Sequence, residues 1–290
     1  MKCLICGKKK FKIIWNDKIR SGINKFTKKK EKILQCESCE LVFLKKRKKI
    51  LENSALTRKH FNKNNSIKEF VKFHSTREFK KFNFIKKYLN FEKKDILESN
   101  CGAGLIINAL KKKAKTTAGI DNPIYEKFLT NNNHLFFKNV DETIIKKIKF
   151  DIIFSLSEIE HKFDPILFIK KIRKILKKNG YLILRIPNFK NIYSYLLHKS
   201  FFRYDFRTSH NYYFSENNLD LMFKKLNFKI HLKRGFNEYS LNHLSTYMIK
   251  NKRVKTKDVK NIFNLKTSQR VLENIEKSNV STSFIYILKN

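Results

Sequence analysis

Four of the five cysteines lie in two closely spaced pairs near the start of the chain. Cys3 and Cys6 are separated by two residues, and so are Cys36 and Cys39. Two thiolates that flank a tight turn can bind one tetrahedral metal ion, and a second such turn completes four ligands. The spacing therefore predicts a structural zinc site without an open coordination position. The alternative is that buried or redox-active cysteines fall in two pairs by chance.

A turn of small residues forms a second candidate site, in the segment LESNCGAGL at residues 97–105. Gly102 and Gly104 would let the backbone approach a ligand closely, and the free N–H groups of a following helix would face that ligand. A dinucleotide site usually has a third glycine after these two, and it is absent here, so we expect a methyl donor without phosphate. Asn100 stands where a further glycine is expected, so it must either adopt a positive φ or bend the turn.

Two acidic residues accompany this turn. Glu98 ends the apolar segment before the glycines, where its carboxylate could hold a turn amide or an ammonium group. Asp121 ends the next apolar segment, and a carboxylate there can accept hydrogen bonds from both hydroxyls of a ribose. The predicted cofactor-binding residues are therefore Glu98, Asn100, Gly102, Gly104 and Asp121.

Two histidines are candidates for catalysis. Methyl transfer to a hydroxyl requires removal of its proton, and histidine is the usual base near neutral pH. His161 follows an apolar segment, and His210 lies in an aromatic, basic stretch at residues 189–215. The alternatives are structural, because His161 could fix its turn through Asp164 and the aromatic stretch could form a helical lid that buries its phenylalanines.

These residues need a scaffold in which successive strands end at one edge. From residue 95 onward, apolar segments alternate with segments of helical periodicity, a pattern typical of a parallel sheet covered by helices on both faces. Such sheets bind ligands beyond the carboxyl ends of their strands. We expect strands at 95–99, 116–121, 134–140, 150–161, 181–188, 228–236 and 283–290, helices at 104–114, 123–132, 165–180, 215–227 and 267–278, and zinc-ribbon strands at 12–15 and 32–36.

The predicted fold is therefore α/β, a doubly wound and mostly parallel seven-stranded sheet preceded by a small zinc ribbon. We expect the zinc-ribbon-like unit to occupy residues 1–50 and the larger domain to occupy residues 51–290. One or two helices should precede the first strand of the sheet, because Phe70, Phe73 and Phe79 could share one helical face.

The composition is strongly basic. Lys and Arg number 65 against 25 Asp and Glu, a formal net charge of +40 over 290 residues. This charge could attract nucleic acid, anionic lipid or a phosphorylated substrate, or it could reflect a compositional bias, since the lysines are spread over the whole chain. No apolar run is long enough for a signal peptide or for a membrane span of about 20 residues. We therefore expect a cytoplasmic protein.

The order of these motifs resembles that of class I S-adenosylmethionine-dependent methyltransferases. The first motif of that family, E/D-x-G-x-G-x-G, is matched at residues 98–104, and its ribose-binding acid is matched by Asp121. Residues 151–188 resemble the fourth-strand block of the family, and SHNYYFS at 209–215 is similar to its H-x-x-Y-F-S segment. The resemblance implies a Rossmann-like methyltransferase fold, S-adenosylmethionine as the cofactor and the cofactor-binding residues given above.

A zinc-bearing unit ahead of such a domain resembles the methyltransferases that modify sugars carried on nucleotides. This resemblance implies a small or lipid-linked sugar-type acceptor, a small molecule or glycan that could also be phosphorylated, and it leaves the acceptor atom (O, N or C) open. Some quinone O-methyltransferases bind a metal through E-x-x-E-H, but Ser157 occupies the first of these positions, so no catalytic metal is expected. The alternatives are an RNA methyltransferase and a non-catalytic zinc-ribbon protein that binds nucleic acid.

Overall fold

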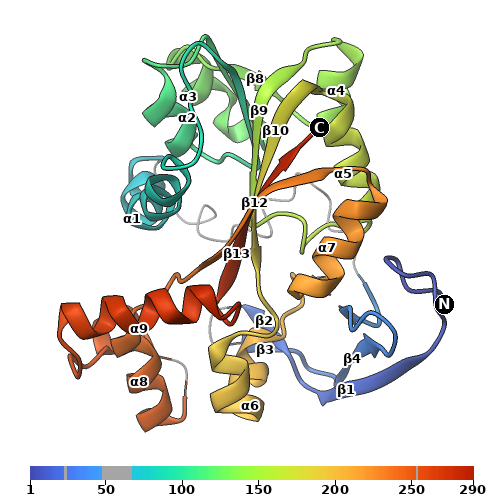
Figure 1. Ribbon diagram of the computed structural model, residues 1–290, viewed down its shortest axis with the longest axis vertical. Helices are drawn as coiled ribbons and strands as arrows, with labels where there is room; N and C mark the ends of the chain where they lie inside the picture. The colour runs from blue at the N-terminus through green and yellow to red at the C-terminus, as the bar shows by residue number, and fades with distance from the viewer. Residues whose placement is uncertain (23–24, 48–66, 253) are drawn as a thin grey trace.

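The computed structural model describes residues 1–22, 25–47, 67–252 and 254–290, and a seven-stranded sheet lies at its centre (Figure 1). The strand order is β12-β13-β10-β9-β6-β7-β8. The bounds are β6 (Asp95–Ser99), β7 (Thr116–Ile120), β8 (Leu135–Phe137), β9 (Phe150–Leu156), β10 (Leu176–Pro187), β12 (Lys229–Phe236) and β13 (Ser283–Lys289). The domain boundary expected near residue 50 lies outside the described residues, so it stays a prediction.

The sheet is mostly parallel. Strands β8, β7, β6, β9 and β10 run parallel to one another, and β13 runs antiparallel to both of its neighbours, β10 and β12. The central strands are continuous apolar segments, as strands covered on both faces must be. In β9, for example, Ile152, Ile153 and Phe154 are all buried. The predicted doubly wound α/β fold is confirmed.

Helices cover both faces of this sheet (Figure 1). In that view α1, α2 and α3 lie on one side, and α4, α5 and α7 lie on the other. Ile106 and Ile107 belong to the buried cluster on the first side, and Ile169 and Met222 belong to the cluster on the second. The bounds are α1 (Ile67–Ile85), α2 (Leu105–Leu110), α3 (Glu126–Asn131), α4 (Val140–Ile145), α5 (Pro165–Lys174) and α7 (Glu216–Lys225), with 3₁₀ turns at Pro123–Tyr125 and Thr256–Asp258.

One predicted helix is longer than the observed one. The apolar periodicity from residue 165 predicts a helix that ends at Gly180, but α5 ends at Lys174 and β10 begins at Leu176. Leu176 already pairs with Phe150 of β9, and Lys177 Nζ contacts the carboxylates of two other strands. These tertiary contacts outweigh the helical propensity of the lysine-rich segment.

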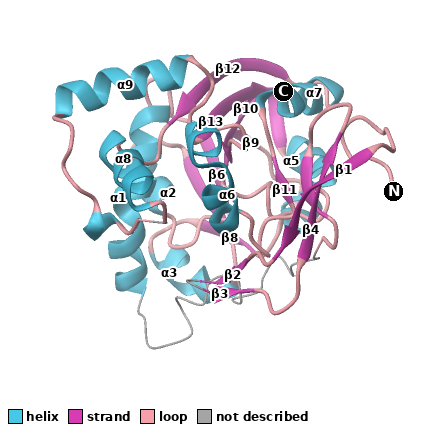
Figure 2. Cartoon of the chain, turned by 90° about the horizontal axis from the view of Figure 1, so that it is seen from below, coloured by secondary structure: helices cyan, strands magenta, loops and turns pink. Residues whose placement is uncertain are grey.

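The N-terminal residues form a second, antiparallel sheet with the order β1-β4-β5-β11 (Figure 2). The two strands expected in the zinc ribbon are confirmed as parts of β1 and β4. The fourth strand, β11, comes from the larger domain, so the two parts of the chain share this sheet. The bounds are β1 (Phe11–Asp17), β4 (Glu31–Cys36), β5 (Val42–Leu44) and β11 (Tyr212–Tyr213), with a separate hairpin of β2 (Arg20–Gly22) and β3 (Lys25–Phe26).

Three further helices, α6 (Ile192–Asp205), α8 (Leu241–Lys250) and α9 (Leu265–Lys277), lie at one end of the molecule, below the sheet in Figure 1. The sequence predicted α9 but not α8, and it left α6 as one alternative for the aromatic stretch. Both helices begin at side-chain caps, since Asn191 accepts from Tyr193 N and Ser240 accepts from His243 N. Among the described residues, no helix is long and apolar enough to cross a bilayer.

Candidate active site

The turn after β6 adopts the tight conformation that its small residues predict. Asn100, Gly102 and Gly104 all have positive φ angles, of 59°, 56° and 65°. Asn100 therefore takes the first of the two alternatives open to it, because Asn tolerates the left-handed region better than most residues do. Gly104 is also needed for packing, since a Cβ there would lie 2.7 Å from Leu129 Cδ2 of α3.

Asp121 lies beside this turn and binds its backbone. Gly102 N–H donates to Asp121 Oδ2 at 2.6 Å, and Asn122 N–H donates to Oδ1 at 2.7 Å. A carboxylate has about four acceptor positions, so both oxygens can accept further hydrogen bonds. The structure thus brings together the glycine turn and the acid that the sequence assigned to a ribose.

Glu98 lies beneath the same turn with one carboxyl oxygen unused. Its side chain is buried, and no described residue donates a hydrogen bond to its Oε2. Burial, and to a smaller extent the nearby Glu78 carboxylate, raise the pKa of Glu98 to about 8. A buried acceptor without a partner is rare in proteins, and a cationic ligand would satisfy it. These residues fit the expected S-adenosylmethionine, which carries both an amine and a ribose.

The two predicted catalytic histidines lie together beyond the end of β9. The ring centroids of His161 and His210 are 4.7 Å apart. Nδ1 of His161 lies 2.6 Å from the carbonyl oxygen of Ser209, so Nδ1–H donates there and Nε2 carries the free lone pair in the neutral ring. Burial lowers the pKa of His210 well below its ordinary value, so this imidazole is neutral at pH 7.

Glu160 is a third member of this cluster that the sequence did not predict. Its Oε1 lies 4.0 Å from His161 Nε2, and its Oε2 is buried without a hydrogen bond among the described residues. The ligand atoms of Glu160, His161 and His210 all lie within 4.8 Å of one another. The cluster can accept a proton from a bound hydroxyl, and a small adjustment would also let one cation contact all three groups. Glu160 precedes His161 in the chain, but no local pattern places His210 beside them.

The cofactor turn and the histidine cluster lie at the same edge of the sheet. Strands β6 and β9 are neighbours, with Ser99 opposite Ser155. Glu158, in the turn after β9, accepts hydrogen bonds from Ser99 Oγ at 3.1 Å and Ser155 Oγ at 2.7 Å. Lys162 Nζ also contacts Glu158 at 2.9 Å, so this carboxylate joins the two turns. The two candidate sites are therefore adjacent.

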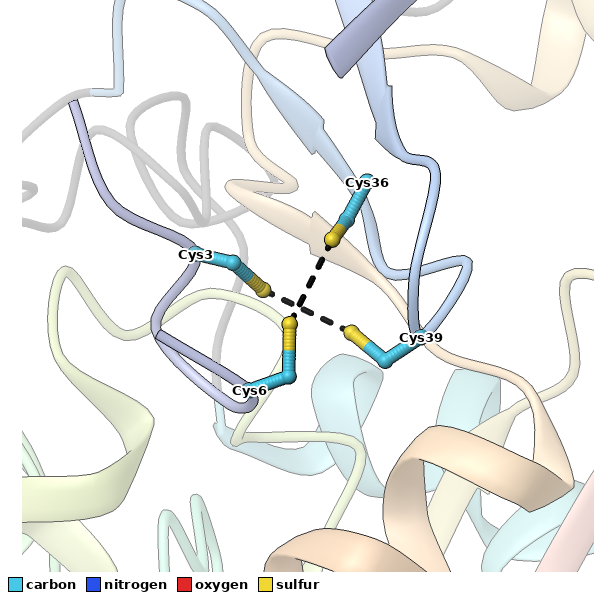
Figure 3. Close-up of side chains that lie close together, drawn as sticks. All are labelled: Cys3, Cys6, Cys36 and Cys39. Atoms are coloured by element: carbon cyan, nitrogen blue, oxygen red, sulfur yellow. Dashed lines mark hydrogen bonds between the residues drawn. The ribbon is translucent and has the colours of Figure 1, made fainter. Parts of the chain in front are cut away.

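The four N-terminal cysteines converge on one point (Figure 3). The Sγ atoms of Cys3 and Cys39 are 3.5 Å apart, as are those of Cys6 and Cys36, and all four lie within 4.8 Å of one another. Tetrahedral zinc with Zn–S bonds of about 2.3 Å requires sulfur atoms about 3.8 Å apart. The contact between Cys3 and Cys39 lowers the pKa of Cys3 to about 5 and raises the pKa of Cys39, so this contact makes Cys3 the thiolate of the pair. The donor set therefore fits a structural zinc ion.

The two cysteine turns have the same backbone conformation although their sequences differ. Gly7 N–H donates to Cys3 O, and Glu40 N–H donates to Cys36 O, both at 2.9 Å. Gly7 and Glu40 have φ angles of 77° and 58°. The left-handed conformation at this position is energetically unfavourable for Glu40, because it has a Cβ atom. The Glu40 carboxylate also forms an ion pair of 2.7 Å with Lys190.

Two arginines of the aromatic stretch have partners within the protein. The Arg203 guanidinium lies over the Phe26 ring at 5.5 Å, and Arg207 pairs with Asp205 at 3.0 Å. These contacts give both arginines a role in packing the stretch against the rest of the protein.

Comparison with known proteins identifies the family. A family model described as a methyltransferase domain matches residues 70–233, which is more than half of the chain. The chain belongs to this methyltransferase domain family. The matched region contains the glycine turn, Asp121 and both histidines of the cluster. The predicted class I methyltransferase resemblance is thus confirmed at the level of the family.

Curated relatives match part of this methyltransferase domain. Ubiquinone biosynthesis O-methyltransferase of Pelagibacter ubique is 33% identical over 108 residues, which cover 35% of this chain and 45% of that protein. The enzyme of the same name from Hydrogenovibrio crunogenus is 28% identical over 124 residues, which cover 39% of this chain and 50% of that protein. The chain spans about half the length of the curated relatives it matches.

A solved structure shares the fold of the methyltransferase domain. It is a complex between the Haloferax volcanii Trm112 methyltransferase activator and a methyltransferase, and it matches with a TM-score of 0.50 and 11% identity. The match covers 75% of this chain and 92% of the other. At this identity the match supports the fold alone.

Proposed function

We propose that the protein transfers a methyl group from S-adenosylmethionine to a hydroxyl group of a small molecule. The observation that carries this proposal is the hydrogen-bonded junction through Glu158, which places the glycine turn next to the Glu160, His161 and His210 cluster. The family match and the names of the curated relatives support the same reaction class.

The residues of the cofactor turn bind S-adenosylmethionine and orient it. Asp121 holds the ribose hydroxyls, and Glu98 provides its unused oxygen to the amine. Gly102 and Gly104 keep the backbone close to the ligand. S-adenosylmethionine supplies an electrophilic methyl group, and its transfer is a single displacement that depends mainly on alignment of the acceptor.

The histidine cluster prepares the acceptor. His161 is the more exposed of the two histidines, and its Nε2 is available to take the proton of a bound hydroxyl. His210 and Glu160 are buried beside it, so His210 orients the ring and the Glu160 carboxylate stabilises the imidazolium that forms. The resulting oxyanion is the nucleophile for methyl transfer.

Two acceptor classes have a specific observation in their favour. The names of the curated relatives favour a phenolic ring, as in a quinone precursor. The four-cysteine unit favours the sugar-type acceptor that the sequence resemblance predicts. A phenol is the more acidic of the two, so it requires less help from His161.

Labelled S-adenosylmethionine added to purified protein and fractionated cell extract would test the proposal. We expect the label in a small-molecule fraction, and extraction would separate phenolic lipids from nucleotide sugars and glycolipids. Transfer into RNA, with a steep loss at higher salt, would instead support the RNA methyltransferase alternative. Absence of label from all fractions, with no binding of S-adenosylmethionine, would contradict the proposal.

A further inference from the structure

The N-terminal sheet borders the proposed acceptor site. Strand β11 closely follows His210 in the chain, and its Tyr212 and Tyr213 pair with Phe43 and Val42 of β5. The N–H of Leu44 extends this pairing by donating to Asn211 O at 3.0 Å. In Figure 2, β11 belongs to the same sheet as β4 and β1, and β5 lies between β11 and β4. Strand β11 therefore joins a sheet whose other strands all lie near the start of the chain.

The same segment is bonded on its other side to the turn that carries Glu160 and His161. The N–H groups of Asn211 and Tyr212 both donate to the carbonyl oxygen of Glu160, at 2.9 and 3.2 Å. The Tyr212 hydroxyl donates to Phe163 O at 3.0 Å. Residues 211 and 212 therefore join the N-terminal sheet to the acceptor turn.

Asn211 makes the largest share of these contacts. It is fully buried, and its Nδ2 donates to the carbonyl oxygens of His161 at 2.9 Å and Lys162 at 3.3 Å. These bonds fix the backbone of His161 from one side. The ring of His161 is held from the same segment, because its Nδ1–H donates to Ser209 O.

The second cysteine pair of the four-cysteine site, Cys36 and Cys39, lies directly before β5 in the chain. The second cysteine turn is closed by Cys36 N–H donating to Leu41 O at 2.9 Å, and β5 begins at Val42. A unit of this size has little core of its own, so a bound metal supplies much of its stability. The position of β5, and through it β11, therefore depends on the cysteine site.

We propose that Asn211 is a positioning residue for the acceptor site, and that metal binding by the four cysteines holds the sheet in which Asn211 is anchored. This inference rests on the proposed function. Release of the metal loosens β5, then β11, and then the turn of His161. The cofactor turn keeps its shape, because the hydrogen bond from Gly102 N–H to Asp121 and the packing of Gly104 against Leu129 do not involve the N-terminal sheet.

The test compares zinc-loaded full-length protein with the same protein after treatment with a zinc chelator and with two variants. Asn211→Asp keeps the shape of the side chain but places an oxygen against two carbonyl oxygens. Asn211→Ala removes the two side-chain hydrogen bonds to His161 O and Lys162 O and keeps the backbone ones. Hydrogen exchange is measured in residues 157–163 and 209–214, binding of S-adenosylmethionine by calorimetry, and methyl transfer by steady-state kinetics.

We expect exchange in both segments to rise by about tenfold or more after chelation and in both variants, as for the loss of buried hydrogen bonds. The kcat should fall by about tenfold, while the KM for S-adenosylmethionine changes by less than about twofold. Asn237→Ala is the matched control. Asn237 is also buried, and its Nδ2 donates to Leu272 O at 3.3 Å, but it does not contact the acceptor turn. This control should leave kcat and both segments unchanged.

Two results would overturn the inference. The first is unchanged exchange in residues 209–214 after complete release of zinc. The second is an unchanged kcat in a folded Asn211→Ala protein. If the zinc-loaded wild type fails to bind S-adenosylmethionine, the proposed function fails instead, and the exchange measurements still decide whether the cysteine site holds Asn211.

Discussion

The two halves of the proposed active site are built in different ways. The cofactor half is local in sequence, since the hydrogen bond from Gly102 to Asp121 spans 19 residues. The acceptor half is assembled over long distances, since the contact of His161 with Ser209 spans 48 residues and the bond of Arg47 with Tyr212 spans 165. A short motif can encode the first half, whereas the second exists only once the sheet and the N-terminal unit have folded together.

The largest expected effect comes from a substitution that disrupts the acceptor half and leaves the cofactor half intact. In His161→Gln the group that accepts the proton is lost, so kcat should fall by about 10²- to 10⁴-fold, the usual contribution of a general base. The affinity for S-adenosylmethionine should stay within about twofold of wild type, because the cofactor residues are not altered. His231→Gln, at an exposed histidine on β12, is the control for removal of an imidazole. An equal loss of cofactor binding in His161→Gln would show that the halves are not separate.

The second prediction concerns a substitution that disrupts the cofactor half and leaves the acceptor half intact. Asp121→Ala removes a carboxylate that binds the turn and is proposed to bind the ribose, so affinity for S-adenosylmethionine should fall by about tenfold to hundredfold. Calorimetry would measure this loss. Hydrogen exchange around His161 should remain at the level of wild type. If Asp121→Ala binds S-adenosylmethionine as tightly as wild type does, Asp121 does not bind the cofactor.

The third prediction concerns the ionisation of Glu98. Its pKa is raised to about 8 chiefly by burial, so the carboxyl is protonated at pH 7 before a cationic ligand binds. Binding of S-adenosylmethionine should then release a proton, and affinity should rise with pH, up to about tenfold per unit below the pKa of Glu98. Calorimetry in buffers of different ionisation enthalpy would count the proton. In Glu98→Gln this proton release should disappear.

The same pKa shift affects stability. Because the folded protein holds the Glu98 proton more tightly than the unfolded chain does, this group lowers the free energy of unfolding as pH rises from about 4.5 to about 8. Glu98→Gln should therefore be more stable than wild type at pH 8 in chemical denaturation. The raised pKa would be contradicted if Glu98→Gln were no more stable than wild type at pH 8, or if its gain in unfolding free energy were larger at pH 4 than at pH 8.

The smallest expected effects come from two residues with positive φ, one in each region. Asn100→Gly should change the affinity for S-adenosylmethionine by no more than about threefold, because Asn already adopts the required conformation. Glu40→Gly should relieve about 1 kcal/mol of backbone strain but lose the ion pair with Lys190, so the unfolding free energy should change little. Lys190→Gln removes the ion pair but keeps the strained Glu40 backbone, so it measures the contribution of the ion pair separately from that of the strain. A loss of more than about 2 kcal/mol in Glu40→Gly would show that the ion pair outweighs the strain.

The contrast between the halves also explains what the sequence could predict. The seven strands of the large sheet, the turn with Gly104 and the paired cysteines follow from local patterns, and each lies within or overlaps the expected segment. The strands expected at 134–140 and 150–161 are shorter, since β8 ends at Phe137 and β9 ends at Leu156. The helix at 165–180 was predicted too long, because contacts of Leu176 and Lys177 with other strands were not visible in the chain. The proximity of Glu160 to His210, and the role of Asn211 between two sheets, depend on pairing between β5 and β11 that no local pattern indicates.

The most direct test is calorimetric titration of S-adenosylmethionine into zinc-loaded wild type, His161→Gln and Asp121→Ala. The account predicts saturable one-to-one binding to wild type, nearly the same affinity for His161→Gln, and an affinity lower by about tenfold or more for Asp121→Ala. No saturable binding to wild type, or equal weakening in both variants, would contradict a methyltransferase whose cofactor and acceptor halves are built independently.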